Sequence, residues 1–249
     1  MKKGLFAACV ALPLLAWTGN ASGYLTSSAQ LLDNLADRRG NLKLQDVSAQ
    51  LTADIEGIDS PVEERIFIKS PERLRLVQET PDGTRLYIER EGRRAEGSEA
   101  SLKSLSGPST GMLAALLMPR GNTPGEKVNR LLSLLKSVGI NTRSVNLGIY
   151  GDDVRESAFI IGAKAWESDK AQLWIDRESY QPVRLVIYDE SGGERVRYES
   201  RYLGYGSPAG GVWFPETIEN YRNGELVRRS RLNEVRTNEN LPESMFRLP

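Results

Sequence analysis

The chain has 249 residues, with 33 basic and 33 acidic side chains, no histidine and one cysteine, Cys9. The balanced charge argues against a nucleic-acid binder, which needs an excess of lysine and arginine on one face. The lack of histidine excludes Ser-His-Asp and Cys-His nucleophile systems and every histidine-ligated metal site. We therefore expect no enzyme, no cofactor and no metal.

The first 23 residues have the layout of a secretory signal peptide. Two lysines precede an apolar run from Leu5 to Trp17, and the small cluster Ala21-Ser22-Gly23 follows. The run is too short for a permanent membrane helix, which needs about 20 apolar residues. Cys9 lies inside the run, whereas the cysteine of a lipoprotein ends it. We expect cleavage after Gly23 and an unacylated periplasmic protein that forms one domain over residues 24–249.

A helix and four strands are predicted after the leader. Ser27 or Ser28 can cap a helix that runs to about Arg38, with Gly40 as its stop. The next segment, Val47–Ile55, alternates strictly between apolar and polar residues, which is typical of a strand with one buried face. Further strands are predicted at Arg65–Ser70, Arg73–Val77 and Leu86–Arg90, the last after a Pro81-Asp82-Gly83 turn.

Two amphipathic helices are predicted in the middle of the chain. The first is the apolar block Gly111–Met118, which Pro119 ends. The second begins at Thr123-Pro124-Gly125-Glu126, a capping box with proline at the first helical position. Its apolar stripe consists of Val128, Leu131, Leu132, Leu135 and Val138, and Gly139 ends it.

Seven more strands are predicted in the last hundred residues. Alternation is clear from Glu194 onward, where Val196, Tyr198 and Tyr202 face one way and arginines face the other. Asn223-Gly224 is a strong hairpin signal. The predicted strands are Val145–Tyr150, Glu156–Ile161, Ala171–Asp176, Pro182–Tyr188, Glu194–Tyr205, Val212–Tyr221 and Leu226–Val235.

These elements predict a mainly β protein with helices, of the α+β class. About ten to eleven short antiparallel strands make a sheet that must curl or close. The two mid-chain helices need cover for their apolar stripes, so we expect them on the concave side of the sheet. The predicted architecture is a curled antiparallel half-barrel with a helical lid and an apolar interior.

Three stretches of the chain carry a resemblance to a known family. They are Ser70-Pro71-Glu72-Arg73-Leu74-Arg75 after a strand, Leu173–Arg177 leading to Gln181-Pro182-Val183-Arg184, and Trp213-Phe214-Pro215-Glu216 with Asn238, Leu241-Pro242 and Phe246. In this order, with helices in the gap, they resemble the periplasmic lipoprotein carriers of the LolA and LolB group and their relatives, the RseB-type regulators. Carriers of the best-known type have an arginine where this chain has Ser70. Either another residue, such as Lys69 or Arg73, then latches the lid, or the lid has no latch.

The resemblance implies an exported carrier that shields acyl chains of lipoproteins or lipids in outer-membrane lipoprotein sorting or lipid transport. The alternative is a periplasmic domain that senses a lipid or lipoprotein and contacts a membrane protein. Implied partners are acyl chains and an inner-membrane transporter or outer-membrane acceptor, and we expect a monomer. Leu74 matches the family position where a large apolar residue faces the cavity. The predicted acyl cavity is lined by Leu51, Ile66, Ile68, Leu74, Leu76, Leu113, Leu116 and Leu117.

Charged clusters have simpler interpretations. The acidic pairs Asp152-Asp153 and Glu63-Glu64 flank predicted turns, so we interpret them as solvated loop charges. Arg228, Arg229 and Arg231 form a basic cluster on a predicted strand. That cluster is either an ordinary solvated strand face or a docking patch for lipid headgroups or an acidic partner.

Overall fold

The computed structural model describes residues 26–69, 73–90, 93–98, 101–104, 112–151, 155–190 and 192–248. The predicted signal peptide with Cys9, the latch position Ser70, Gly111 and the pair Asp152-Asp153 lie outside the described residues. Within them the chain is mainly β with a few helices, as predicted. No helix of the described residues is long and apolar enough to cross a membrane.

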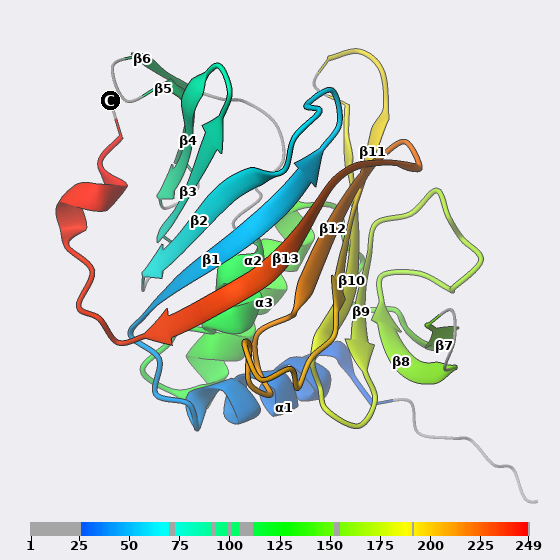
Figure 1. Ribbon diagram of the computed structural model, residues 1–249. Helices are drawn as coiled ribbons and strands as arrows, with labels where there is room; N and C mark the ends of the chain where they lie inside the picture. Colours follow the sequence, from blue (N-terminus) through cyan, green and yellow to red (C-terminus); the bar gives the residue numbers. More distant parts are fainter. Residues whose placement is uncertain are drawn as a thin grey trace, which may run out of the picture.

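One antiparallel sheet contains all thirteen strands of the described residues, in the order β6-β5-β4-β3-β2-β1-β13-β12-β11-β10-β9-β8-β7. In the part of the chain that the structure describes, the edge strands β6 and β7 are not paired with each other, so the sheet is open. It curls strongly (Figure 1). The strands are β1 (Asp46–Ile55), β2 (Val62–Lys69), β3 (Arg73–Thr80), β4 (Gly83–Arg90), β5 (Arg93–Ser98), β6 (Ser101–Ser104), β7 (Val145–Tyr150), β8 (Glu156–Ile161), β9 (Gln172–Asp176), β10 (Pro182–Asp189), β11 (Val196–Leu203), β12 (Thr217–Arg222) and β13 (Glu225–Thr237).

The structure corrects the predicted strands in two places. It has two strands more than the sequence indicated, β5 and β6, whose charged, glycine and serine residues do not alternate. Pairing with β4 imposes the extended conformation on β5, for example at Ile88 opposite Ala95, and pairing with β5 imposes it on β6. The strand predicted to begin at Val212 begins at Thr217 instead. The preceding residues form a turn in which the amide of the buried Phe214 donates to the Gly210 carbonyl.

Capping side chains fix the start of two helices. The hydroxyl of Ser27 accepts from the Gln30 amide and begins α1 (Ser28–Gly40). Thr123 does the same for the Glu126 amide at the start of α3 (Pro124–Ser137), as the capping box predicts. The Glu126 carboxylate reaches back to the amide of Asn122, one residue before the cap. The short helix α2 (Met112–Leu117) precedes α3, and the 3-10 turn η1 (Glu243–Phe246) lies near the end of the chain.

The two mid-chain helices, α2 and α3, lie on the concave side of the sheet (Figure 1), as predicted. One buried cluster joins apolar residues of all three helices to Ile66 and Leu74 in β2 and β3 and to Ile161 and Leu173 in β8 and β9, which lie on opposite sides of β1 and β13 in the strand order. Strands so far apart in one sheet can meet the same helices only if the sheet curls around them. Figure 1 shows α2 and α3 within this curve and α1 across its lower end.

Candidate functional site

The inner face of the sheet borders a partly open cavity of about 420 Å³. Its walls come from β2 to β5 on one side and from β10 to β13 on the other, and Met112 and Leu113 of α2 contribute as well. Pockets that bind small ligands typically measure about 300–1,000 Å³. The space between the two halves of the curled sheet is therefore large enough for a ligand.

The structure divides the eight residues of the predicted acyl cavity into two groups. Four line the cavity: Ile66, Leu74, Leu76 and Leu113. The other four are at most 1% exposed and pack in the core beside the cavity: Leu51, Ile68, Leu116 and Leu117. Further apolar lining comes from β10 and β12, at Leu185, Ile187 and Ile218. Acyl binding by this set stays a prediction.

A buried carboxylate stands on the inner face, contrary to the sequence interpretation of Glu64 as a solvated loop charge. Glu64 lies in β2, and its side chain is 0% exposed. It accepts hydrogen bonds from Gln78 Nε2 at 2.6 Å, from Ser230 Oγ at 2.7 Å and from Arg228 Nη2 at 2.5 Å. Because paired residues share a face, its partners Leu51 and Gln78 place it on the inner side.

The basic cluster of the C-terminal strand is divided between the two faces. Arg228 lines the cavity and pairs with Glu64. Arg229 pairs with Glu219 at 2.7 Å, and Arg231 pairs with Asp54 at 2.9 Å. All three guanidinium groups are therefore matched by carboxylates, and they do not form one basic patch.

Two further polar residues stand next to Arg228 across the strands. Asn220 of β12 is the direct partner of Arg228, and Ser200 of β11 is the direct partner of Asn220. All three residues line the cavity. Asn220 Nδ2 donates to Ser200 Oγ at 2.9 Å, whereas its buried Oδ1 has no hydrogen-bond partner. We call Glu64, Gln78, Ser200, Asn220, Arg228 and Ser230 the polar wall, of which Glu64 and Ser230 are buried beside Arg228 and the other four line the cavity.

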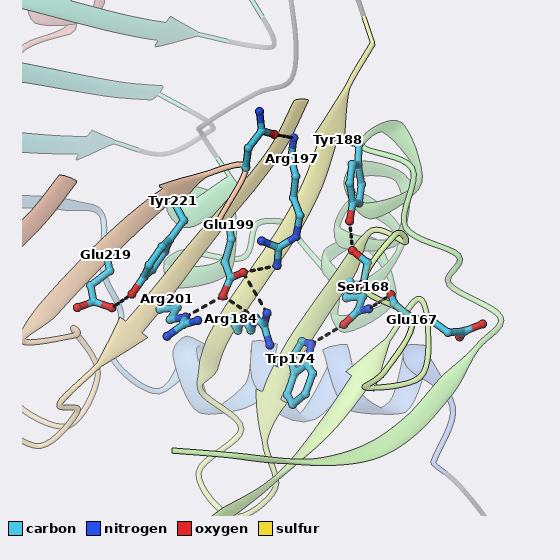
Figure 2. Close-up of polar contacts among 12 residues, drawn as sticks. Glu167, Ser168, Trp174, Arg184, Tyr188, Arg197, Glu199, Arg201, Glu219 and Tyr221 are labelled. Carbon is cyan, nitrogen blue, oxygen red and sulfur yellow. Dashed lines mark hydrogen bonds and ion pairs between the residues drawn. The ribbon is translucent and has the colours of Figure 1, made fainter. Parts of the chain in front are cut away.

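An ion cluster stabilises the same strands from the outer face (Figure 2). Arg184, Arg197 and Arg201 all contact the carboxylate of Glu199, which is 3% exposed. Burial alone would raise the pKa of Glu199. Hydrogen bonds from Arg201 and Arg184, with the nearby charge of Arg197, outweigh it and hold that pKa below its ordinary value. Since Glu199 precedes Ser200 in β11, this cluster fixes the strand that carries part of the polar wall.

The described contacts of the lid differ from the predicted latch. Lys69 and Arg73 bind the C-terminal tail: both pair with Glu243, and Lys69 also donates to the Leu241 carbonyl. The connection between α2 and α3 is held by Arg120 instead. Its Nη2 donates to the carbonyl of Leu44 at 2.9 Å, just before β1.

Sequence reasoning missed the polar wall. The predicted strand began at Arg65, one residue too late to include Glu64 in the alternation Glu64-Ile66-Ile68. Likewise, Arg228, Ser230 and Leu232 alternate with Arg229 and Arg231. That period of two was the available signal that Arg228 faces the opposite way from its two neighbours.

The arrangement offers enclosed apolar surface and hydrogen-bonding groups. Among the side chains that the structure describes, no group of three or more carboxylates, histidines or cysteines is placed to hold a metal ion. What the geometry can do is bury an apolar chain and contact a polar group attached to it.

Comparisons with known proteins find likeness in the fold. No protein-family model and no curated protein sequence matches the chain. Among solved structures, a LolA superfamily protein from Nitrosomonas europaea is 12% identical, with 90% of this chain and 98% of that chain covered and a TM-score of 0.50. A DUF1329 family protein from Desulfovibrio piger is 13% identical, with 89% and 98% covered and a TM-score of 0.51. The chain shares the LolA superfamily's curled-sheet fold, which confirms the resemblance at the level of fold.

Proposed function

We propose that this protein is an exported, non-enzymatic carrier that shields acyl chains of lipoproteins or lipids, in outer-membrane lipoprotein sorting or lipid transport in the periplasm. The observation that carries the proposal is the cavity of about 420 Å³ between the halves of the curled sheet, with apolar lining from Ile66, Leu74 and Leu113. Each methylene that moves from water into such a site contributes about 0.8 kcal/mol. Burial of an acyl chain therefore supplies the binding energy without any chemical step.

Lipid extraction and native mass spectrometry of the purified protein test the proposal. We expect co-purifying acyl species. Leu76→Glu should abolish them, because an unpaired carboxylate in an apolar site is costly. Leu76 lines the cavity yet is only partly buried, so its replacement should leave the fold intact. Leu203→Glu is the matched control, since Leu203 is 36% exposed.

Two results would contradict the carrier. One is a wild-type protein that neither retains nor binds any acyl species, and the other is a Leu76→Glu protein that binds a fluorescent fatty acid as well as wild type does. Leu116 is a poorer probe, because its side chain is 0% exposed in the core and Leu116→Glu would mainly destabilise folding. A stable stoichiometric complex with a membrane protein would favour the alternative of a lipid-sensing regulatory domain.

A further inference from the structure

The cavity is amphipathic along its length. Gln78 lies just before the β3–β4 turn, and Asn220 and Arg228 flank the β12–β13 turn. The apolar lining residues Ile66 and Leu74 belong instead to the buried cluster that contains α2. A ligand in this cavity therefore meets apolar side chains near α2 and the polar wall toward the hairpin turns.

The charges of the polar wall are already matched. Glu64 accepts two hydrogen bonds from Arg228, from Nε at 3.1 Å and from Nη2 at 2.5 Å. This pair leaves no net charge to attract a carboxylate or a phosphate. Of the other charged residues of the lining, Arg85 and Arg94 balance Glu96 and Asp189, and Glu199 is paired with arginines on the outer face.

Two hydrogen-bonding groups of the polar wall remain unused. Asn220 Oδ1 is a buried acceptor without a partner. The Nη1 group of Arg228 is a donor that makes no hydrogen bond to any described residue, because the bonds of Arg228 to Glu64 and Ser230 come from Nε and Nη2. Asn220 and Arg228 are direct cross-strand partners, so the unused acceptor and the unused donor are neighbours.

We propose that the ligand of this cavity is an acyl amphiphile with an uncharged polar group that both donates and accepts hydrogen bonds, namely a hydroxyl or an amide. This inference rests on the carrier function proposed above. The polar group lies against Asn220 and Arg228, and the acyl chain extends toward Leu113. A buried acceptor is costly when it is unpaired, so a ligand that lacks a donor leaves Asn220 Oδ1 unsatisfied and binds more weakly. A fatty-acid carboxylate loses its hydration when it enters the cavity, and it finds no unpaired cationic side chain among the described lining residues to offset that loss.

The test compares three ligands that share a sixteen-carbon chain: 1-monopalmitoylglycerol, methyl palmitate and palmitate. Each ligand is added below its own critical micelle concentration. The assay measures how much of a bound apolar fluorophore the ligand displaces from the mature chain. We expect wild type to bind monopalmitoylglycerol about tenfold more tightly than methyl palmitate, the effect of about one hydrogen bond. Asn220→Leu should reduce this preference to about twofold or less, because it removes the acceptor that methyl palmitate leaves unsatisfied. Asn233→Leu is the matched control, because Asn233 is exposed on β13 and does not line the cavity.

Each outcome decides between the two proposals. If methyl palmitate and monopalmitoylglycerol bind wild type equally, or if palmitate binds most tightly of the three, the inference about the polar group is wrong while the carrier function stands. The inference also fails if Asn220→Leu keeps the full preference. If no acyl ligand binds to wild type, both the carrier function and this inference fail. Thermal unfolding of Asn220→Leu within a few degrees of wild type shows that a lost preference does not arise from misfolding.

Discussion

Replacing Glu64 by glutamine tests the buried charge that pairs with Arg228 of the cavity lining. The substitution keeps the shape of the side chain but removes the charge that neutralises Arg228. It also turns one of the two carboxylate oxygens into a donor, which then faces either Gln78 Nε2 at the Oε1 position or Ser230 Oγ at the Oε2 position. Breaking a buried ion pair by removing one partner costs about 3–5 kcal/mol. The side chain of Arg228 is 19% exposed, so water recovers part of this cost, and we expect the free energy of unfolding to fall at the lower end of that range.

Urea denaturation measures the effect. With a urea dependence of about 2–3 kcal/mol per molar, a loss of about 3 kcal/mol lowers the unfolding midpoint by about 1 M or more. Glu63→Gln is the matched control, because the neighbouring Glu63 is exposed and should change stability by less than about 0.5 kcal/mol. The double variant Glu64→Leu with Arg228→Met should recover most of the loss, since apolar replacement of a whole buried pair is often neutral or stabilising.

Two results would refute this reasoning. If Glu64→Gln unfolds at the same urea concentration as Glu63→Gln, the pair with Arg228 does not stabilise the fold. If the double variant is less stable than Glu64→Gln alone, the loss comes from packing around Glu64 rather than from an unpaired guanidinium group.

Three further predictions concern the outer face, the β7 edge and the lid. The pKa of Glu199 is depressed in the folded state, so its contribution to stability is present above the ordinary glutamate pKa of 4.5 and is lost as pH falls below that value. Glu199→Gln should therefore weaken the fall of the melting temperature on the acid side of a series from pH 3 to pH 7. Gly148→Val should destabilise by about 1–3 kcal/mol in urea, because a Cβ there would lie 2.9 Å from Trp174. Arg120→Met removes the hydrogen bond to Leu44, so spin labels on α2 and β3 should report a broader distance distribution without lipid than with it.

Each of these predictions has a control and a contrary result. Glu190→Gln, at an exposed glutamate, should keep the acid dependence, and a Glu199→Gln curve that parallels wild type would contradict the first prediction. Gly192→Val meets open space, so equal losses at both glycines would contradict the second. Arg130→Met is the control for the third prediction, because it changes an exposed arginine of α3. A single narrow distance in Arg120→Met with and without lipid would mean a fixed, packed lid.

The periodicity of apolar residues predicts the helices and strands that bury one face. It predicts few of the other elements. The predicted strand Val47–Ile55 matches β1, and Thr123 caps α3 as its sequence indicates. Strands β5 and β6 have no such pattern, because their conformation depends on the neighbouring strand rather than on their own side chains. The apolar lining at Leu74, Leu76 and Leu113 could be predicted for the same reason as the core, since both require apolar residues on the inner face.

The polar wall could not be predicted from residue type, because burial of a charge depends on which face a strand position occupies. Strand β13 illustrates this through its bulge. Leu232 and Glu234 stand opposite adjacent residues of β1, so Asn233 is an extra residue and the alternation shifts by one. Without the shift Glu234 would follow Leu232 onto the inner face. With it, Val235 takes that place opposite Ala49 and packs against the core. The bulge thus keeps the carboxylate of Glu234 outside, while the regular alternation before it places Arg228 inside, where Glu64 meets it.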